Sequence, residues 1–264
     1  RPSRKWPLWN GPIECRLLEL PIEGAKRMDG PAWRKASPDA APFKSRLQKN
    51  LATLTGWAKS EGIECLRLYD ADVPEYNLAV DRYGEHVVVS EYAAPFSVDV
   101  AVAARRVRDA LHVVSEVLEV PEENVVLKVR KRQTGGSQYE RSDIETKKVV
   151  VHEGGLAFEV ELGSHLDTGL FPDHRKLRAV MAEQSRGKRF LNLFAYTCTA
   201  SVHAAKAGAI TTSVDLSGRY LAWGKESFAR NGIALAGHRF LEEDCLRFAS
   251  VSTERFDVIF SNPP

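Results

Sequence analysis

Strand-like and helix-like segments alternate from residue 163 onward, and this alternation limits the possible folds more than any other feature of the sequence. The strand-like segments cover residues 189–194, 210–215, 238–241 and 256–260. A strand that returns to its own sheet through a helix does so by a right-handed crossover, so its strands run parallel. We therefore predict an α/β fold with a Rossmann-like sheet. Such sheets usually contain more strands, so we expect the sheet to be incomplete here and the chain to be part of a longer protein.

A small α+β domain is predicted for residues 43–162. Apolar residues recur at helical spacing from Phe43 to Trp57. A second helix is expected after Asp99, which can cap it, and Gly154-Gly155 predicts a hairpin. Strands are expected at residues 63–68, 77–81, 86–92, 125–131, 148–152 and 156–162. Residues 1–42 are rich in proline and tryptophan and are interpreted as a linker with one strand at 13–20, and residues 163–264 as the first part of the Rossmann-like domain.

The cysteines and the hydropathy exclude several classes of protein. Four cysteines lie far apart without a CxxC pair, at positions 15, 65, 198 and 245. This spacing excludes a zinc ribbon, argues against a disulfide scaffold and favours the reducing cytoplasm, and it gives no reason to expect a metal. No apolar run approaches the roughly 18–20 residues that cross a bilayer. We therefore expect a cytoplasmic protein that is not embedded in a membrane.

Charge is distributed unevenly along the chain. Residues 1–60 contain 12 basic and 5 acidic side chains, residues 61–126 contain 5 and 14, and residues 127–148 contain 7 and 3. Basic blocks of this size are typical of a surface that attracts a polyanion, although solvated faces can segregate in the same way. Charge alone does not decide between these two interpretations. If the partner is a nucleic acid, we predict contacts from Lys128, Arg130, Lys131, Arg132 and Tyr139 in the last block, the tyrosine by stacking on a base.

The carboxyl ends of the predicted parallel strands are where a ligand should bind. The first of these strand ends, residues 192–200, contains no glycine, so it is a poor loop for a dinucleotide and argues against a nicotinamide-dependent oxidoreductase. By itself it is typical of an ordinary strand–helix turn. Asp215 ends the second strand and can accept hydrogen bonds from ribose hydroxyls, and Asp244 follows the third and can accept from the amino group of an adenine. Either aspartate could instead cap the helix that follows it.

The fourth strand ends in Asn262-Pro263-Pro264. Two prolines form a rigid turn without N–H donors, which leaves carbonyl oxygens and an amide side chain toward the ligand. Such a group can accept hydrogen bonds from an exocyclic amine and offers a flat surface to a base. We therefore predict Asn262 and Pro263 as the catalytic pair.

These features resemble the Rossmann-like S-adenosylmethionine-dependent methyltransferases. The resemblance narrows to the bacterial bifunctional 23S rRNA guanine methyltransferase family RlmKL, specifically its C-terminal RlmK half. It is carried by residues 69–77, 79–83, 127–133, 138–139, 167–171, 173–175, 192–197 and 244–246, and it covers the chain from about residue 43. Residues 10–13 are similar to the last strand of the preceding RlmL half.

This resemblance implies S-adenosylmethionine as cofactor, 23S ribosomal RNA as partner, and a fused RlmL-like half upstream. In that family the RlmL half forms N2-methylguanine and the RlmK half forms N7-methylguanine. It implies cofactor contacts from the positions that match the family's motifs, namely Phe171, His174, Arg175, Asn192, Phe194, Tyr196, Thr197, Asp215, Ser217, Asp244 and Cys245. Transfer to N7 requires no proton to be removed first, so we expect positioning to dominate and no catalytic cysteine or strong base.

Two departures from the family pattern keep alternatives open. Cys198 stands where relatives often have glycine, and Asn262 stands where the RlmK half usually has aspartate. Asn-Pro-Pro is commoner in enzymes that methylate exocyclic amines, so methylation of N2 of guanine or N6 of adenine is the alternative function. An RNA-binding module beside an inactive Rossmann-like half is a further alternative.

Overall fold

The computed structural model describes residues 4–10, 13–19, 36–92, 98–130, 147–163 and 167–263. Strands β1 (Arg4–Asn10) and β2 (Ile13–Glu19) pair antiparallel along their full length. The interpretation of the first residues as linker is therefore wrong for β1. Proline at position 7 argues against a strand in the sequence, because it has no N–H donor. A two-stranded ribbon consists only of edge strands, however, and edge strands tolerate a missing donor.

The small module has two helices on one face of a four-stranded sheet. Its helices are α1 (Ala41–Ser60), which follows the 3-10 turn η2 (Pro38–Ala40), and α2 (Val100–Leu118). Asp99 caps α2 by accepting hydrogen bonds from the backbone N–H groups of Ala101 and Val102. The strands lie in the order β3 (Cys65–Asp70), β4 (Leu78–Tyr83), β5 (His86–Tyr92) and β6 (Val125–Arg130), which follows η3 (Glu122–Asn124). Pairing is antiparallel from β3 to β5 and parallel between β5 and β6.

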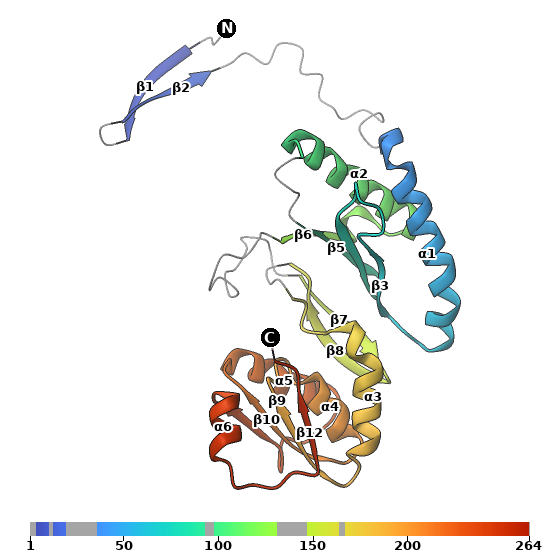
Figure 1. Cartoon of the computed structure of the whole chain (residues 1–264), viewed down its shortest axis with the longest axis vertical. Helices are drawn as coiled ribbons and strands as arrows, with labels where there is room; N and C mark the ends of the chain where they lie inside the picture. Colours follow the sequence, from blue (N-terminus) through green and yellow to red (C-terminus); the bar gives the residue numbers. More distant parts are fainter. Residues whose placement is uncertain are drawn as a thin grey trace.

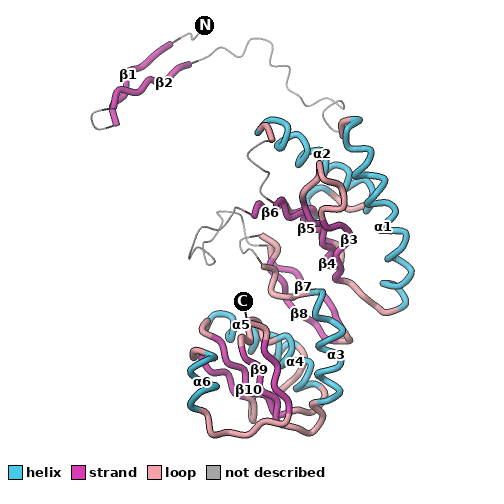
Figure 2. The backbone as a smooth tube through the Cα atoms, viewed as in Figure 1, coloured by secondary structure: helices cyan, strands magenta, loops and turns pink. Residues whose placement is uncertain are grey.

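The core of this module forms between the helices and the sheet. Phe43 and Leu47 lie one helical turn apart on α1 and are fully buried. They pack with Val113 of α2 and with Val80 and Val87 of the sheet. Figure 2 shows both helices on the same side of the sheet. The predicted helical stripe is confirmed for its first four positions, which supply or pack against this core, whereas Trp57 at its end is exposed.

A hairpin packs against both halves of the molecule. Strands β7 (Lys148–Glu153) and β8 (Leu156–Glu161) are joined through Gly154 and Gly155, whose φ angles of 58° and 75° fit the predicted two-residue turn. Phe158 of the hairpin belongs to a buried cluster with Tyr83 of the small sheet and with Val202 and Phe228 of the following helices. Figure 1 shows the hairpin between the two sheets.

The second module is the predicted parallel sheet. Its strands are β9 (Arg189–Leu193), β10 (Ile210–Asp215), β11 (Arg239–Glu242) and β12 (Val258–Ser261). They lie in the order β11-β10-β9-β12, and every pair is parallel. Four helices accompany them, α3 (Arg175–Gln184), α4 (Thr199–Lys206), α5 (Gly218–Arg230) and α6 (Cys245–Val251), and the 3-10 turn η4 (Pro172–His174) leads into α3. The α/β prediction is confirmed for this part of the chain.

Among the residues that the structure describes, none of the helices combines the length and the apolar character that a membrane span requires.

Candidate functional site

The strand order places a crevice at one edge of the parallel sheet. From β9 the chain moves outward to β10 and β11, and it then returns to the opposite side of β9 to form β12. Open α/β sheets bind ligands where the strand order reverses in this way, beyond the carboxyl ends of the strands. Here the reversal lies between β9 and β12. The turn after β9 and Asn262 after β12 flank it, because Ser261 pairs with Leu193 in the register.

The turn after β9 has an unusual backbone. Phe194, Tyr196 and Cys198 all have positive φ angles, of 54°, 50° and 58°. A left-handed conformation costs a residue with a side chain roughly 1–2 kcal/mol, and such strain is concentrated at functional sites. The turn therefore has a glycine-like backbone although it contains no glycine. From the sequence by itself, this segment is interpreted as an ordinary strand–helix turn, because only the dihedral angles reveal its left-handed backbone.

Three hydrogen bonds hold this turn in place. Asp215 Oδ2 accepts from the backbone N–H of Tyr196 at 2.7 Å, and the backbone N–H of Ala195 donates to the Val214 carbonyl at 3.0 Å. Cys245 Sγ accepts from the backbone N–H of Phe194 at 3.1 Å. The ends of the neighbouring strands thus fix the strained backbone.

Asp215 keeps acceptor capacity for a ligand. Its Oδ1 accepts from the backbone N–H of Ser217 at 2.9 Å, so each carboxylate oxygen has one backbone donor and a free lone pair. The helix cap of α5 is Ser217, whose hydroxyl lies 3.4 Å from the backbone nitrogen of Tyr220. The alternative in which Asp215 caps α5 is therefore wrong.

Asp244 is a helix cap. Its Oδ1 accepts from the backbone N–H of Arg247 at 2.7 Å and begins α6, and its side chain is exposed. A cap uses one oxygen, so the other can still accept from a ligand amine. Asn262 and Pro263 are also exposed, directly after β12.

Aromatic side chains line up beside the turn. Tyr196 lies 4.5 Å from Tyr220 and 5.4 Å from Phe171, measured between ring centroids, and Phe171 lies 5.7 Å from His174. Burial raises the pKa of Tyr196 well above its usual value, so its hydroxyl stays protonated. The predicted contact residues Phe171 and His174 are thereby brought to the turn. Tyr220 was missed, and its position in the first turn of the helix after Asp215 is the only signal that could have identified it.

Several predicted cofactor contacts face the interior instead. Asn192 is buried, and its Nδ2 donates to Ser201 of α4 at 2.9 Å. Thr197 is also buried and donates to the Gly169 carbonyl at 2.5 Å. Cys245 is buried against the turn, with Sγ 3.3 Å from the Val214 carbonyl. These three buried side chains support the turn from the protein interior.

Arg175 and Lys128 lie elsewhere than predicted. Arg175 donates to the Cys65 carbonyl and lies over the ring of Trp57, on the side of the hairpin. Lys128 is only 5% exposed, and it lines a small cavity opposite the segment from Asp167 to Asp173. It therefore cannot contribute to an exposed RNA surface. The side chain of Arg130 and all of Lys131, Arg132, Tyr139 and Pro264 lie outside the described residues.

The hydrogen-bond acceptors and aromatic rings at this edge fit a nucleoside. Asp215 and Asp244 offer carboxylate oxygens to hydroxyl and amino groups, Phe171 and Tyr196 offer ring surfaces, and the left-handed turn replaces the glycines that close approach usually needs. No group of three or more potential metal ligands occurs within the described ranges.

Comparison with known proteins agrees with this geometry. Residues 72–264 match the family model described as S-adenosylmethionine-dependent methyltransferase. A protein of Allochromatium vinosum named ribosomal RNA large subunit methyltransferase K/L is 51% identical over 100% of this chain and 37% of its own length. A protein of Psychromonas ingrahamii with the same name is 50% identical over 85% of this chain and 30% of its own length. The chain thus spans about a third of the length of these relatives.

Solved structures show the same fold. The methyltransferase SMU.776, solved with SAH, matches with a TM-score of 0.68 and 28% identity over 87% of this chain and 59% of its own. A SAM-dependent methyltransferase from Streptococcus mutans matches with a TM-score of 0.66 and 27% identity over 85% of this chain and 58% of its own.

Proposed function

Since this chain belongs to the family of S-adenosylmethionine-dependent methyltransferases, we propose that it methylates N7 of a guanine in 23S ribosomal RNA. The observation that carries the proposal is the left-handed turn after β9, fixed to Asp215 at the reversal point of the parallel sheet. The rRNA substrate is supported by relatives of up to 51% identity that are named as large-subunit rRNA methyltransferases. Ribosomal RNA as substrate would place the protein in the cytoplasm.

Each residue at the strand ends has a role in this proposal. S-adenosylmethionine, when bound, supplies a methyl group on a positively charged sulfur. Asp215 would accept hydrogen bonds from the ribose hydroxyls, and Asp244 would accept from the adenine amino group. Phe171 and Tyr196 would form the wall beside the methyl group and exclude water from it.

Positioning would supply most of the rate enhancement at N7. The N7 atom carries a lone pair and loses no proton on methylation, so the protein mainly has to hold it in line with the methyl carbon. The side chains beneath the turn are consistent with this, because burial raises the pKa of the thiols of Cys198 and Cys245 and so disfavours a thiolate nucleophile. Asn262, one residue beyond β12, would contact the target base.

Asn262 also favours a second candidate, methylation of an exocyclic amine of guanine or adenine. Its amide is exposed next to the turn, and the amide oxygen could accept a hydrogen bond from such an amine. The nitrogen of the amine requires this hydrogen bond to become nucleophilic before the methyl group is transferred. We also propose a second methyltransferase half within the same polypeptide, because the matching relatives are about three times as long as the part that aligns.

The test is a methyl-transfer assay of the complete polypeptide with radiolabelled S-adenosylmethionine and unmodified 23S rRNA, followed by nucleoside analysis of the product. N7-methylguanine is the expected product, and Asp215→Ala should abolish it. If only N2-methylguanine or N6-methyladenine formed, the exocyclic-amine alternative would replace the N7 assignment. Absence of transfer to any RNA would contradict both.

A further inference from the structure

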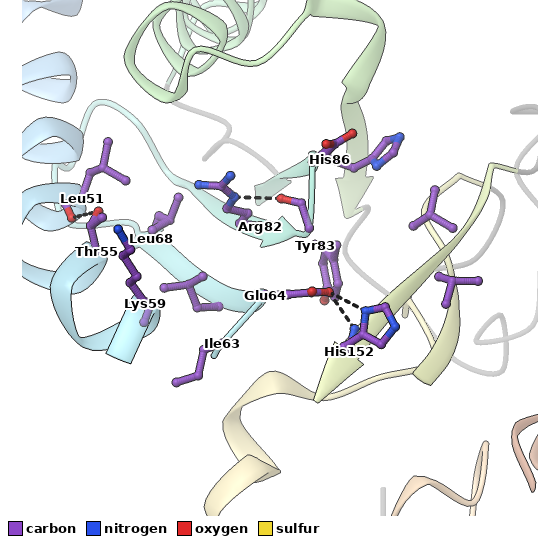
Figure 3. Close-up of a pocket in the computed structure, with 16 residues that line it drawn as sticks. Leu51, Thr55, Lys59, Ile63, Glu64, Leu68, Arg82, Tyr83, His86 and His152 are labelled. Carbon is purple, nitrogen blue, oxygen red and sulfur yellow. Dashed lines mark hydrogen bonds and ion pairs between the residues drawn. The ribbon is translucent and has the colours of Figure 1, made fainter. Parts of the chain in front are cut away.

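Two cavities lie where the hairpin meets the small module, and they share Ile63 and His152 in their walls. The first has a volume of about 660 Å³ and lies between α1, the small sheet and β7 (Figure 3). Figure 3 shows Glu64 at its boundary, where the carboxylate accepts the backbone N–H of His152 at 2.8 Å and contacts the ring Nδ1 at 3.2 Å.

Charges in the first cavity are balanced. Lys59 and Arg82 are matched by Glu64 and Glu85, and burial lowers the pKa of His86, which keeps that ring neutral at pH 7. The cavity therefore has no preference for the charge of a ligand.

The second cavity, of about 470 Å³, is different because its cations exceed its anions. Its basic side chains are Arg175, Lys176 and Lys206, and its acidic side chains are Glu61 and Glu153. Glu153 is already neutralised, since buried Arg178 binds both of its oxygens at 2.7 Å from behind the cavity wall. Among the residues that the structure describes, the neutral backbone carbonyl of Asn231 is the one partner of Lys206, at 3.2 Å. An anion entering the cavity would therefore meet uncompensated positive charge.

An aromatic platform stands at the edge of the same cavity. Trp57, at the end of α1, is 39% exposed, and the Arg175 guanidinium lies 5.6 Å from its ring centroid. Exposed tryptophan rings and guanidinium planes are the surfaces on which unpaired RNA bases stack. One part of the wall is small and apolar, where Ala179, Ala182 and Ala207 leave room for a planar group. The remaining wall includes the imidazole rings of His152 and His203.

This cavity is separate from the candidate cofactor site. The cofactor turn immediately precedes α4, whereas Lys206 and Ala207 lie at the far end of that helix. Eight helical residues span about 12 Å at about 1.5 Å per residue, so Lys206 and Ala207 lie about that far along α4 from the cofactor turn.

We propose that the second cavity binds one nucleotide of the RNA substrate at a distance from the target base. Arg175, Lys176 and Lys206 take its phosphate, and Trp57 stacks on its base. The inference rests on the proposed function, because it takes the ligand to be RNA. It gives the protein a second anchor point, made jointly by the small module, the hairpin and the parallel-sheet module.

The test compares two double variants of equal charge change in the full chain with S-adenosylhomocysteine bound. Lys176→Glu with Lys206→Glu alters the cavity, and Lys49→Glu with Arg186→Glu alters exposed cations elsewhere. Affinity for an unmodified 23S rRNA transcript is measured over a range of salt concentrations. We expect the affinity of the cavity variant for RNA to fall at least about 10-fold. The slope of log affinity against log salt concentration should decrease by the equivalent of one to two ion contacts. The affinity of the control variant should stay within about 3-fold of the wild-type value.

A cross-linking arm tests the base contact. Transcripts that carry 5-iodouridine should cross-link to the peptide containing Trp57, and Trp57→Ala should weaken RNA binding while Trp57→Phe restores most of it. Equal losses in the two double variants, or cross-links only elsewhere, would overturn the cavity's role. Failure of the wild type to bind 23S rRNA would instead reject the proposed function itself.

Discussion

Asp215 Oδ2 accepts the backbone N–H of Tyr196 at 2.7 Å, and this contact ties the end of β10 to the left-handed turn after β9. The same carboxylate accepts from Ser217 through its other oxygen. One side chain therefore orders two segments of the candidate cofactor site while keeping a lone pair on each oxygen for a ligand.

Asp215→Asn should weaken the binding of S-adenosylhomocysteine. The asparagine amide places an N–H donor opposite the backbone N–H of either Tyr196 or Ser217. It also removes a charged acceptor, whose hydrogen bond to the ligand is worth about 1.5–3 kcal/mol. The affinity for S-adenosylhomocysteine should therefore fall about 10- to 100-fold. Calorimetric titration measures the change. The matched control is Asp257→Asn, because Asp257 accepts the backbone N–H of Arg189 at 2.8 Å at the opposite end of β9. Equal affinity in the two variants would refute the role of Asp215.

Gly224→Ala should destabilise the parallel-sheet module. A Cβ at Gly224 would lie 2.6 Å from Cys198 Sγ, which is fully buried, so we expect a loss of about 1–3 kcal/mol in the free energy of unfolding. Cys198→Gly should rescue it, because it removes the clashing sulfur and suits the φ of 58°. Urea denaturation of both single variants and the double variant gives the coupling energy. Simple additivity would show that the two positions do not meet.

Glu153 should make the protein sensitive to acid. Burial alone would raise its pKa, but His203, whose Nε2 lies 3.3 Å from Glu153 Oε1, and the two hydrogen bonds and charge of Arg178 outweigh burial and lower the pKa from 4.5 to about 2. Its stabilising contribution is therefore complete above about pH 4.5 and is lost as the pH falls toward 2.

Denaturation of Glu153→Gln at several pH values tests this directly. At pH 7 the variant should be less stable by about 3–5 kcal/mol, because Arg178 is left buried without its partner, and the difference from the wild type should shrink below pH 4.5. Glu159→Gln, which alters a more exposed carboxylate of the same hairpin, should cost about 1 kcal/mol or less. A difference for Glu153→Gln that stays constant with pH would contradict the assignment.

The cysteines that the structure describes in full should resist alkylation in the native protein. Burial raises the pKa of Cys65 and of Cys198 to about 12, so the thiolate is scarce at pH 8, and Cys245 is also buried. Iodoacetamide labelling followed by peptide mass spectrometry should modify these three residues only in denaturant. Rapid labelling of native Cys198 would indicate a reactive thiol and reopen the question of a cysteine nucleophile.

Periodicity predicted the elements whose cores are local. The apolar stripe from Phe43 to Trp57 predicted α1, and the alternation of strands and helices predicted the parallel sheet. Both patterns could be used because they follow from the geometry of the backbone. The position of Asp215 followed from the same reasoning. Boundaries were less accurate; β3, for example, begins two residues later than expected and contains a register shift between Arg67 and Tyr69.

Features made by contacts between distant segments could not be predicted in this way. Lys128 carries the charge of a surface residue, yet it is buried and lines a cavity together with a segment about forty residues further along the chain. Asn192 matches a family motif, but its side chain faces Ser201 rather than the crevice, because alternate residues of a strand point to opposite faces. The strained turn escaped notice for the related reason that its left-handed residues are not glycines.

The hairpin of β7 and β8 has a consequence for how the molecule can move. Phe158 is buried in one cluster with side chains of the small sheet and of α4 and α5. A rotation of one module against the other would have to expose this shared apolar surface to water, at about 25 cal/mol for each Å² uncovered. The hairpin therefore acts as a rigid spacer, which keeps Trp57 of the small module at a fixed distance from Lys176 and Lys206 of the parallel-sheet module across the second cavity.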